Sequence, residues 1–255
     1  MPSPGETQPD PTLRLLWRHV TPALDGAPRR GRPPKVSVDE VVDAAIDLAD
    51  RDGLESLSMR ALAEHLGVGA MSLYTYVASR DDLVVLMVDR AIGRTELPSM
   101  ADDLRARLTL VAEIQLADYR SHPWLLDVGG VRAWLGPHVA DRYEWQLSAV
   151  EGVGLDDIEM DQTVTLVAGF AANVARAEQA VRRTERESGM SDAEWWQANH
   201  EALAEVMAHR EYPIAGRVGS AAGEAYQAGS DPRRELEFGL ARILDGISVL
   251  LKDAV

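Results

Sequence analysis

The chain has 255 residues, of which 46% are hydrophobic and 26% charged, and this ordinary globular composition excludes disorder over most of its length. Cysteine is absent, which excludes disulfides and thiolate metal sites and favours a cytoplasmic protein. The net charge of −15 argues against uniform nucleic-acid binding, and no apolar run reaches the ~20 residues of a membrane span, so we expect no membrane contact.

Residues 1–35 are expected to form a flexible extension, interrupted by a short helix within residues 12–20. At its end the sequence RRGRPPK contains the G-R-P core of an AT-hook, and no acidic residue follows until Asp39. An extended Arg-Pro segment suits a narrow minor groove, although a solvated basic linker remains the alternative. The candidate side chains of this arm are Arg29, Arg30, Arg32 and Lys35.

Residues 36–96 contain unusually clear helix signals. Ser37 and Glu40 form a capping box that opens a helix ending near Gly53. Ser58 opens a second helix, the third is expected over residues 70–77, and a fourth follows Ser79. The second and third helices are joined by L-G-V-G, which predicts a helix-turn-helix because glycine permits the sharp reversal.

The stretch 36–89 strongly resembles the DNA-binding domain of the tetracycline-repressor (TetR) family of bacterial transcription regulators. The pieces that carry this resemblance are AAIDLA, GLESLSMRALAEHLGV, SLYTYV and SRDDL, in unbroken register. The C-terminal DPRRELEFGLARILDGI resembles the branch that contains the tetracycline repressor itself. The resemblance implies a homodimer with a four-helix interface, a palindromic double-stranded DNA operator at the nucleoid, and a small-molecule effector.

In such a motif the third helix enters the major groove, and Leu73 and Val77 are expected to face inward. By position, the resemblance assigns DNA contact to Gly69, Ala70, Met71, Ser72, Tyr74, Thr75 and Tyr76. This set lacks Arg, Lys, Asn and Gln, so it offers no bidentate base reader. From the flanking helices we add Met59, Arg60 as the candidate for a guanine contact, and Arg80 as a phosphate contact.

Residues 97–255 are predicted to be helical over 101–121, 137–150, 156–187, 191–209 and from 231 onward, with a glycine-rich loop over 211–230. No convincing strand occurs, so we predict an all-α fold. It comprises an N-terminal three-helix helix-turn-helix domain (36–96) and a C-terminal ligand-binding and dimerisation domain (97–255).

The last helix carries apolar residues at steps of four and three, the spacing of a bundle seam. A dimer interface is the functional interpretation and an intramolecular core helix is the alternative. The seam residues are Leu236, Leu240, Ile243, Ile247 and Leu250.

Aromatic side chains concentrate in the second domain, where they could line a pocket between helices or simply pack the core. A largely apolar or aromatic effector is the resulting prediction. The candidate ligand-binding residues are Trp124, Trp134, Tyr143, Leu166, Phe170, Asn173 and Trp195.

No nucleophile, phosphate-binding or metal motif is found, so we expect no catalytic residues, no metal and no cofactor. Tetracycline itself is not expected as the effector, since no histidine is in register with the chelating position of that branch. The preferred interpretation is a ligand-released homodimeric repressor. A DNA-binding activator or architectural protein that senses no ligand is the alternative, and an enzyme with a DNA-binding head lacks a catalytic constellation.

Overall fold

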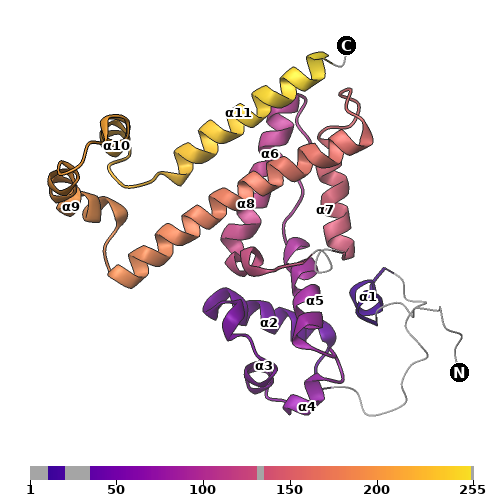
Figure 1. Ribbon diagram of the computed structural model, residues 1–255. Coiled ribbons are helices and arrows are strands. Elements are labelled where there is room, and N and C mark those ends of the chain that lie inside the picture. The colour runs from indigo at the N-terminus through magenta and orange to yellow at the C-terminus, as the bar shows by residue number, and fades with distance from the viewer. Residues whose placement is uncertain (1–10, 21–34, 131–134, 254–255) are drawn as a thin grey trace, which may run out of the picture. The chain divides into compact units, whose positions relative to one another are not determined.

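The computed structural model describes residues 11–20, 35–130 and 135–253, and in these ranges every regular element is a helix (Figure 1). The all-α fold is therefore confirmed for the described part of the chain. The chain divides into two compact units, residues 1–164 and 165–255, and the border between them lies within one long helix. This border differs from the predicted domain border at residue 97, because helices from both sides of residue 97 pack together within the first unit.

The first unit begins with a short α-helix that precedes the helix-turn-helix and ends with two longer ones. Its α-helices are α1 (Pro11–Leu16), α2 (Val38–Asp52), α3 (Met59–His65), α4 (Ala70–Leu73), α5 (Arg80–Ile92), α6 (Leu104–Ser121) and α7 (Pro137–Ser148). Short 3-10 helices occur at Leu54–Ser56 and Pro123–Asp127. The long helix α8 (Asp157–Ser188) crosses into the second unit, which adds α9 (Asp192–Met207), α10 (Pro213–Tyr226) and α11 (Pro232–Asp253).

Helix starts follow the capping signals of the sequence. The hydroxyl of Ser37 accepts a hydrogen bond from the backbone N–H of Glu40 (3.1 Å), whose carboxylate accepts one from the Ser37 N–H (2.6 Å). Ser191 and Glu194 form the same reciprocal pair at α9. These bonds satisfy N–H groups that the first helical turn leaves unpaired, which fixes where α2 and α9 begin.

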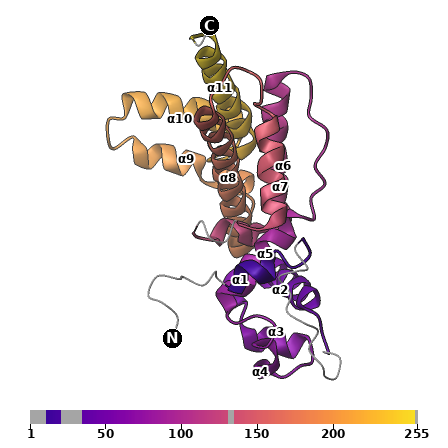
Figure 2. The ribbon, with the colours of Figure 1, turned by 90° about the vertical axis from the view of Figure 1, so that its right-hand side faces the viewer.

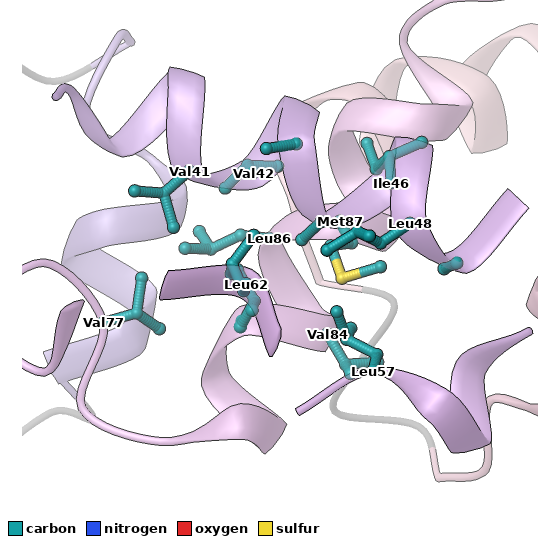
Figure 3. Packing of buried hydrophobic residues seen from close by; sticks show 14 of the residues in the cluster. Val41, Val42, Ile46, Leu48, Leu57, Leu62, Val77, Val84, Leu86 and Met87 are labelled. Atoms are coloured by element: carbon teal, nitrogen blue, oxygen red, sulfur yellow. The ribbon is translucent and has the colours of Figure 1, made fainter. Parts of the chain in front are cut away.

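The helix-turn-helix is built on a continuous apolar core (Figure 3). Val42 and Ile46 of α2, Leu62 of α3 and Met87 of α5 are all buried in it. Leu16 of α1 joins the same cluster, so the first unit includes part of the N-terminal extension. The predicted short helix within residues 12–20 therefore exists and is packed in place.

The turn between α3 and α4 has the backbone expected from its sequence. Gly67 adopts a φ of 64°, in the left-handed region that favours glycine. The N–H of Val68 donates to the carbonyl of Ala63 (3.0 Å), which closes the end of α3. Regular α-helix in the predicted segment 70–77 covers only Ala70–Leu73, and hydrogen-bonded turns continue the chain to Val77.

The predicted loop over 211–230 is wrong, because residues 213–226 form α10. Pro213 occupies the first turn, where a missing N–H costs nothing. Three of the four glycines in this segment, Gly216, Gly219 and Gly223, lie within the helix, and one of them lets a neighbouring ring approach closely. A Cβ atom at Gly223 would overlap the ring of Trp196 on α9.

Candidate functional site

The exposed surface around α4 presents most of the residues predicted to contact DNA. Met71 is 80% exposed and Tyr74 is also exposed, although both are large apolar or aromatic side chains. Leu73 and Val77 face the core, as expected, and hold this surface in place. The remaining exposed members of the set are Gly69, Ala70, Ser72 and Thr75, and Tyr76 is half-buried against the core. The helix-turn-helix therefore exposes most of these predicted contact residues to solvent.

Two residues of the predicted DNA-contact set have structural roles in the first unit. Met59 is buried in the core, because it begins α3 on the side that faces α2, so its side chain cannot reach DNA. Arg80 donates from Nε to the carbonyl of Leu57 (2.8 Å) and from Nη2 to that of Leu54 (2.6 Å). These bonds tie the start of α5 to the 3-10 helix. Arg60 is exposed on α3, on the outside of the motif.

The basic arm can be placed only at its end. Lys35 is exposed, whereas Arg29, Arg30 and Arg32 lie outside the described residues. Before the arm, Arg18 and His19 both contact Asp39 of α2. Trp17 donates from Nε1 to the carbonyl of Leu135 (3.0 Å), which connects α1 to the segment before α7.

A carboxylate on α2 is clamped by two arginines. Asp43 accepts a bidentate pair from Arg90 of α5, with both N···O distances at 3.0 Å, and a further bond from Arg94 (2.8 Å). The Arg90 hydrogen bonds lower the pKa of Asp43 below its usual 3.8, and partial burial opposes this shift only in part. The clamp fixes the angle between α2 and α5.

Helix α5 is joined to α7 by an aspartate that the sequence does not mark. Asp89 is 4% exposed, and its Oδ1 accepts from the backbone N–H groups of His138 (2.9 Å) and Val139 (3.1 Å). Its Oδ2 contacts His138 Nδ1 at 2.8 Å. Asp89 therefore caps the N-terminus of α7 from another helix, so α5 and α7 are held together by a charge-assisted contact.

The residues predicted to bind a ligand are divided between the two units. Trp124 is packed in the core of the first unit and donates from Nε1 to Asp50 (2.7 Å). The hydroxyl of Tyr143 donates to Asp161 (2.8 Å), which raises the pKa of Tyr143. In the second unit Leu166, Asn173 and Trp195 are exposed, and Phe170 packs so closely on Gly239 of α11 that a Cβ there would overlap its ring. Trp134 lies outside the described residues.

A cluster of polar side chains lies between α6 and α7. Asp118 accepts from Arg142, and the hydroxyl of Thr95 donates to the same carboxylate (2.6 Å). Nearby, Gln146 donates to Gln115 (3.3 Å), and all of these residues except Thr95 are buried. Within the described part of the chain, the Nε of Arg142 has no hydrogen-bond partner. In the sequence, Gln115 takes a position in the apolar stripe of α6. A polar residue at such an inward-facing position was the sequence feature that pointed to this buried cluster.

The predicted dimer seam on α11 faces the interior of its own chain. Leu240 and Ile247 are only 7% and 6% exposed in the single chain, so they are not available to a partner. Leu236 and Ile243 are half-buried, and Leu250 alone among the seam residues is exposed. The opposite side of the same helix exposes Phe238, at 67%, and Val249. The intramolecular alternative therefore describes the seam better.

Within the described residues no helix is both long and apolar enough to cross a membrane.

A buried helical core that presents a short, exposed second helix after a glycine turn defines a helix-turn-helix DNA-binding protein. Residues 41–87 match the family model described as bacterial regulatory proteins, tetR family. Residues 97–251 match the model described as tetracyclin repressor-like, C-terminal domain. The chain belongs to the TetR family of transcription regulators, and not to a family of enzymes.

Three known proteins illustrate the similarity. The HTH-type transcriptional repressor DrrR1 of Streptomyces coeruleorubidus is 39% identical over 242 residues, which cover 94% of this chain and 86% of that protein. Apo ActR from Streptomyces coelicolor has a TM-score of 0.68 at 21% identity, covering 88% of this chain and all of that one. ActR bound to actinorhodin gives a TM-score of 0.64 at 22% identity, covering 85% and 98% of the two chains. Mycobacterium smegmatis BioQ gives a TM-score of 0.56 at 20% identity, covering 84% and 99%, and a further BioQ structure contains its double-stranded DNA operator.

Proposed function

We propose that the chain is a homodimeric repressor that leaves its operator when a small aromatic ligand binds. The exposed surface around Met71 and Ser72 on a rigid core is the observation that carries the DNA-binding part. A repressor that is 39% identical along 94% of the chain supports the direction of regulation.

In this proposal α4 lies in the major groove. Ala70 and Met71 contact thymine methyl groups, and the hydroxyls of Ser72 and Tyr74 donate to phosphates. Arg60 reads a guanine from the adjacent helix. The basic arm that ends at Lys35 adds contacts in the flanking minor groove.

The test of DNA recognition uses an operator selected from random-sequence DNA and fluorescence anisotropy at a fixed salt concentration. Arg60→Ala should weaken operator binding by about 1–3 kcal/mol, or roughly 5- to 150-fold, and relax the preference for guanine at one position. Arg51→Ala is the matched control, because it removes an exposed arginine from α2. If the two variants lose the same affinity, the loss comes from the removal of a positive charge near DNA, and the assignment of Arg60 to a guanine contact is wrong.

For the dimer we propose the outward faces of α8 and α11. Leu166 on α8 and Phe238 and Val249 on α11 are large apolar side chains that the single chain leaves exposed. The α8 residues Leu166, Gly169 and Asn173 follow steps of three and four, as in a helical seam, and are exposed together. An interface here would bury apolar side chains that the single chain leaves exposed to water.

Phe238→Asp should therefore give a folded monomer, because the side chain is exposed in the single chain and a charge cannot be solvated in a dry interface. Light scattering measures the mass and circular dichroism confirms the helices. Met71→Asp is the control, since it places the same charge on the DNA-binding surface. A Phe238→Asp dimer as stable as the wild type would exclude this interface.

For the effector we propose a site between α6 and α7, next to Gln115, Gln146 and the unpaired Nε of Arg142. Small-molecule sites combine an apolar enclosure with a few polar groups that orient the ligand. The neighbouring protein ActR has been solved in complex with actinorhodin, and this supports a small-molecule effector for the present chain.

Adding actinorhodin to the protein–operator complex should lower DNA affinity by roughly 5–150-fold, the usual range of allosteric coupling. Gln115→Ala should weaken this response while leaving DNA binding in the absence of ligand unchanged. Glu113→Ala, an exposed change on the same helix, serves as the control. If actinorhodin binds without changing DNA affinity, the ligand-independent alternative is favoured.

A further inference from the structure

The α9–α10 hairpin contains a cavity that the proposed function does not use. The two helices lie side by side, as both ribbon views show (Figures 1 and 2). The space between them has a volume of about 550 Å³, and its lining among the described residues comes from positions 196–227. Small-molecule sites in proteins typically have about 300–1,000 Å³. The cavity is thus large enough for a compound of several fused rings.

One wall of the cavity is a row of large side chains from α9. Trp196, His200, Leu203 and Met207 line it at steps of four, three and four, which place them on one helix face. The rings of Trp196 and His200 are stacked, with their centroids 6.1 Å apart and their planes 22° from parallel. The His200 Nδ1 lies 3.0 Å from the carbonyl of Trp196, which holds the imidazole in this orientation.

The opposite wall is formed mainly by small residues of α10, Ala215, Gly216, Gly219 and Ser220. Gly216 and Gly219 of α10 line the cavity, and a Cβ atom at either position would meet nothing within 4 Å. One turn further, the Trp196 ring sits directly against Gly223 and closes that end. Large side chains of α9 that face small residues of α10 leave a slot, and a planar molecule fits a slot better than a bulky one.

The charge of the α9–α10 hairpin indicates which planar molecules the slot favours. Residues 190–230 carry six acidic side chains and two arginines, for a net charge of −4. Glu224 lines the slot, and so does Arg210, whose Nη1 is 3.5 Å from the hydroxyl of Tyr212. The acidic excess attracts cations, and the face of an indole ring adds a further attraction for a positive charge.

We propose that the slot between α9 and α10 is a binding site for a flat aromatic cation, stacked on Trp196 and His200. The site is separate from the effector site proposed between α6 and α7. It requires neither DNA binding nor operator release, so the two proposals can fail independently.

The test uses the full-length protein, freed of nucleic acid, and proflavine, a planar acridine that is cationic at neutral pH. Fluorescence anisotropy should give saturable binding at one site per chain. Anthraquinone-2-sulfonate, a planar anion, should bind at least tenfold more weakly in equilibrium dialysis. Glu224→Gln should weaken proflavine binding several-fold.

Gly219→Leu should reduce proflavine affinity at least tenfold, because the new side chain enters open space inside the slot. Leucine favours a helix more than glycine does, so α10 should not unfold. Ala221→Leu is the control on the same helix, since Ala221 is exposed and does not line the slot.

Equal proflavine affinity in Gly219→Leu and the wild type would overturn the proposal. So would equal binding of the cation and the anion. If Gly219→Leu shifts the dimer toward monomer in light scattering and leaves the proflavine titration unchanged, a second copy of the chain fills the slot, and the small-molecule assignment is wrong.

Discussion

Replacing Asp89 with alanine should destabilise the first unit substantially, because it removes the contact that caps α7 from α5. The side chain accepts two backbone N–H bonds, of 2.9 and 3.1 Å, and contacts the ring of His138. A buried N–H without an acceptor costs about 1–3 kcal/mol. Water can reach the half-exposed His138 side chain and compensate in part, so we expect a loss of about 2–4 kcal/mol. Asp89→Asn keeps an acceptor for the N–H groups and should cost about 1 kcal/mol.

Urea unfolding followed by circular dichroism measures both losses, at one fixed protein concentration so that dimerisation does not alter the comparison. Asp47→Ala is the control, since Asp47 is an exposed aspartate within α2 and its removal should change the free energy of unfolding by no more than about 0.5 kcal/mol. If Asp89→Ala and Asp47→Ala unfold at the same urea concentration, the bonds to α7 contribute nothing and the cap is incidental.

Three further changes test neighbouring contacts. Gly136→Ala should cost about 1–3 kcal/mol in urea unfolding, because its Cβ would overlap the Asp89 carboxylate. Asp43→Asn should lower the free energy of unfolding by about 1 kcal/mol at pH 7. Because the folded-state pKa of Asp43 lies below 3.8, this difference from the wild type should shrink as the pH falls below about 4. A difference that stays constant with pH would exclude the arginine clamp as its cause. Arg80→Met should lower stability by about 1–2 kcal/mol and leave the salt dependence of DNA binding unchanged, whereas a shallower salt slope would restore Arg80 as a phosphate contact.

Local signals in the sequence were sufficient for most helices. A serine whose hydroxyl binds the third N–H, as at Ser37 and Ser191, depends only on neighbouring residues. The same holds for Gly67, whose left-handed backbone the turn requires. The inward positions of Leu73 and Val77 followed from their spacing alone. Such features need no knowledge of distant parts of the chain.

Features that depend on distant contacts were missed or misplaced. The helix α10 was predicted as loop, because glycine weakens a helix in isolation, but Gly223 packs against the ring of Trp196, which lies 27 residues earlier. The roles of Asp89 and Asp43 depend on partners about 50 residues away along the chain. Nothing in the local sequence distinguishes these aspartates from exposed ones.

The face of α11 illustrates a different limit. The helix carries apolar residues on more than one side, and spacing alone does not show which side faces the interior of the chain and which faces solvent. Leu240 and Ile247 form the better heptad line, yet the chain buries that line itself and leaves Phe238 outside. Leu166 and Phe170, two of the predicted ligand-binding residues, likewise share a helix but differ in exposure, which their spacing alone does not show.

The packing of α1 bears on how the N-terminal segment can be studied. Leu16 fills a place in the core, Arg18 and His19 hold Asp39, and Trp17 reaches the segment before α7. Deleting residues 1–35 would therefore remove the contacts that α1 makes within the first unit together with the basic arm. A truncated protein that binds DNA poorly would not reveal which loss was responsible. Neutralising the arginines of the arm one by one, with α1 intact, separates the two contributions.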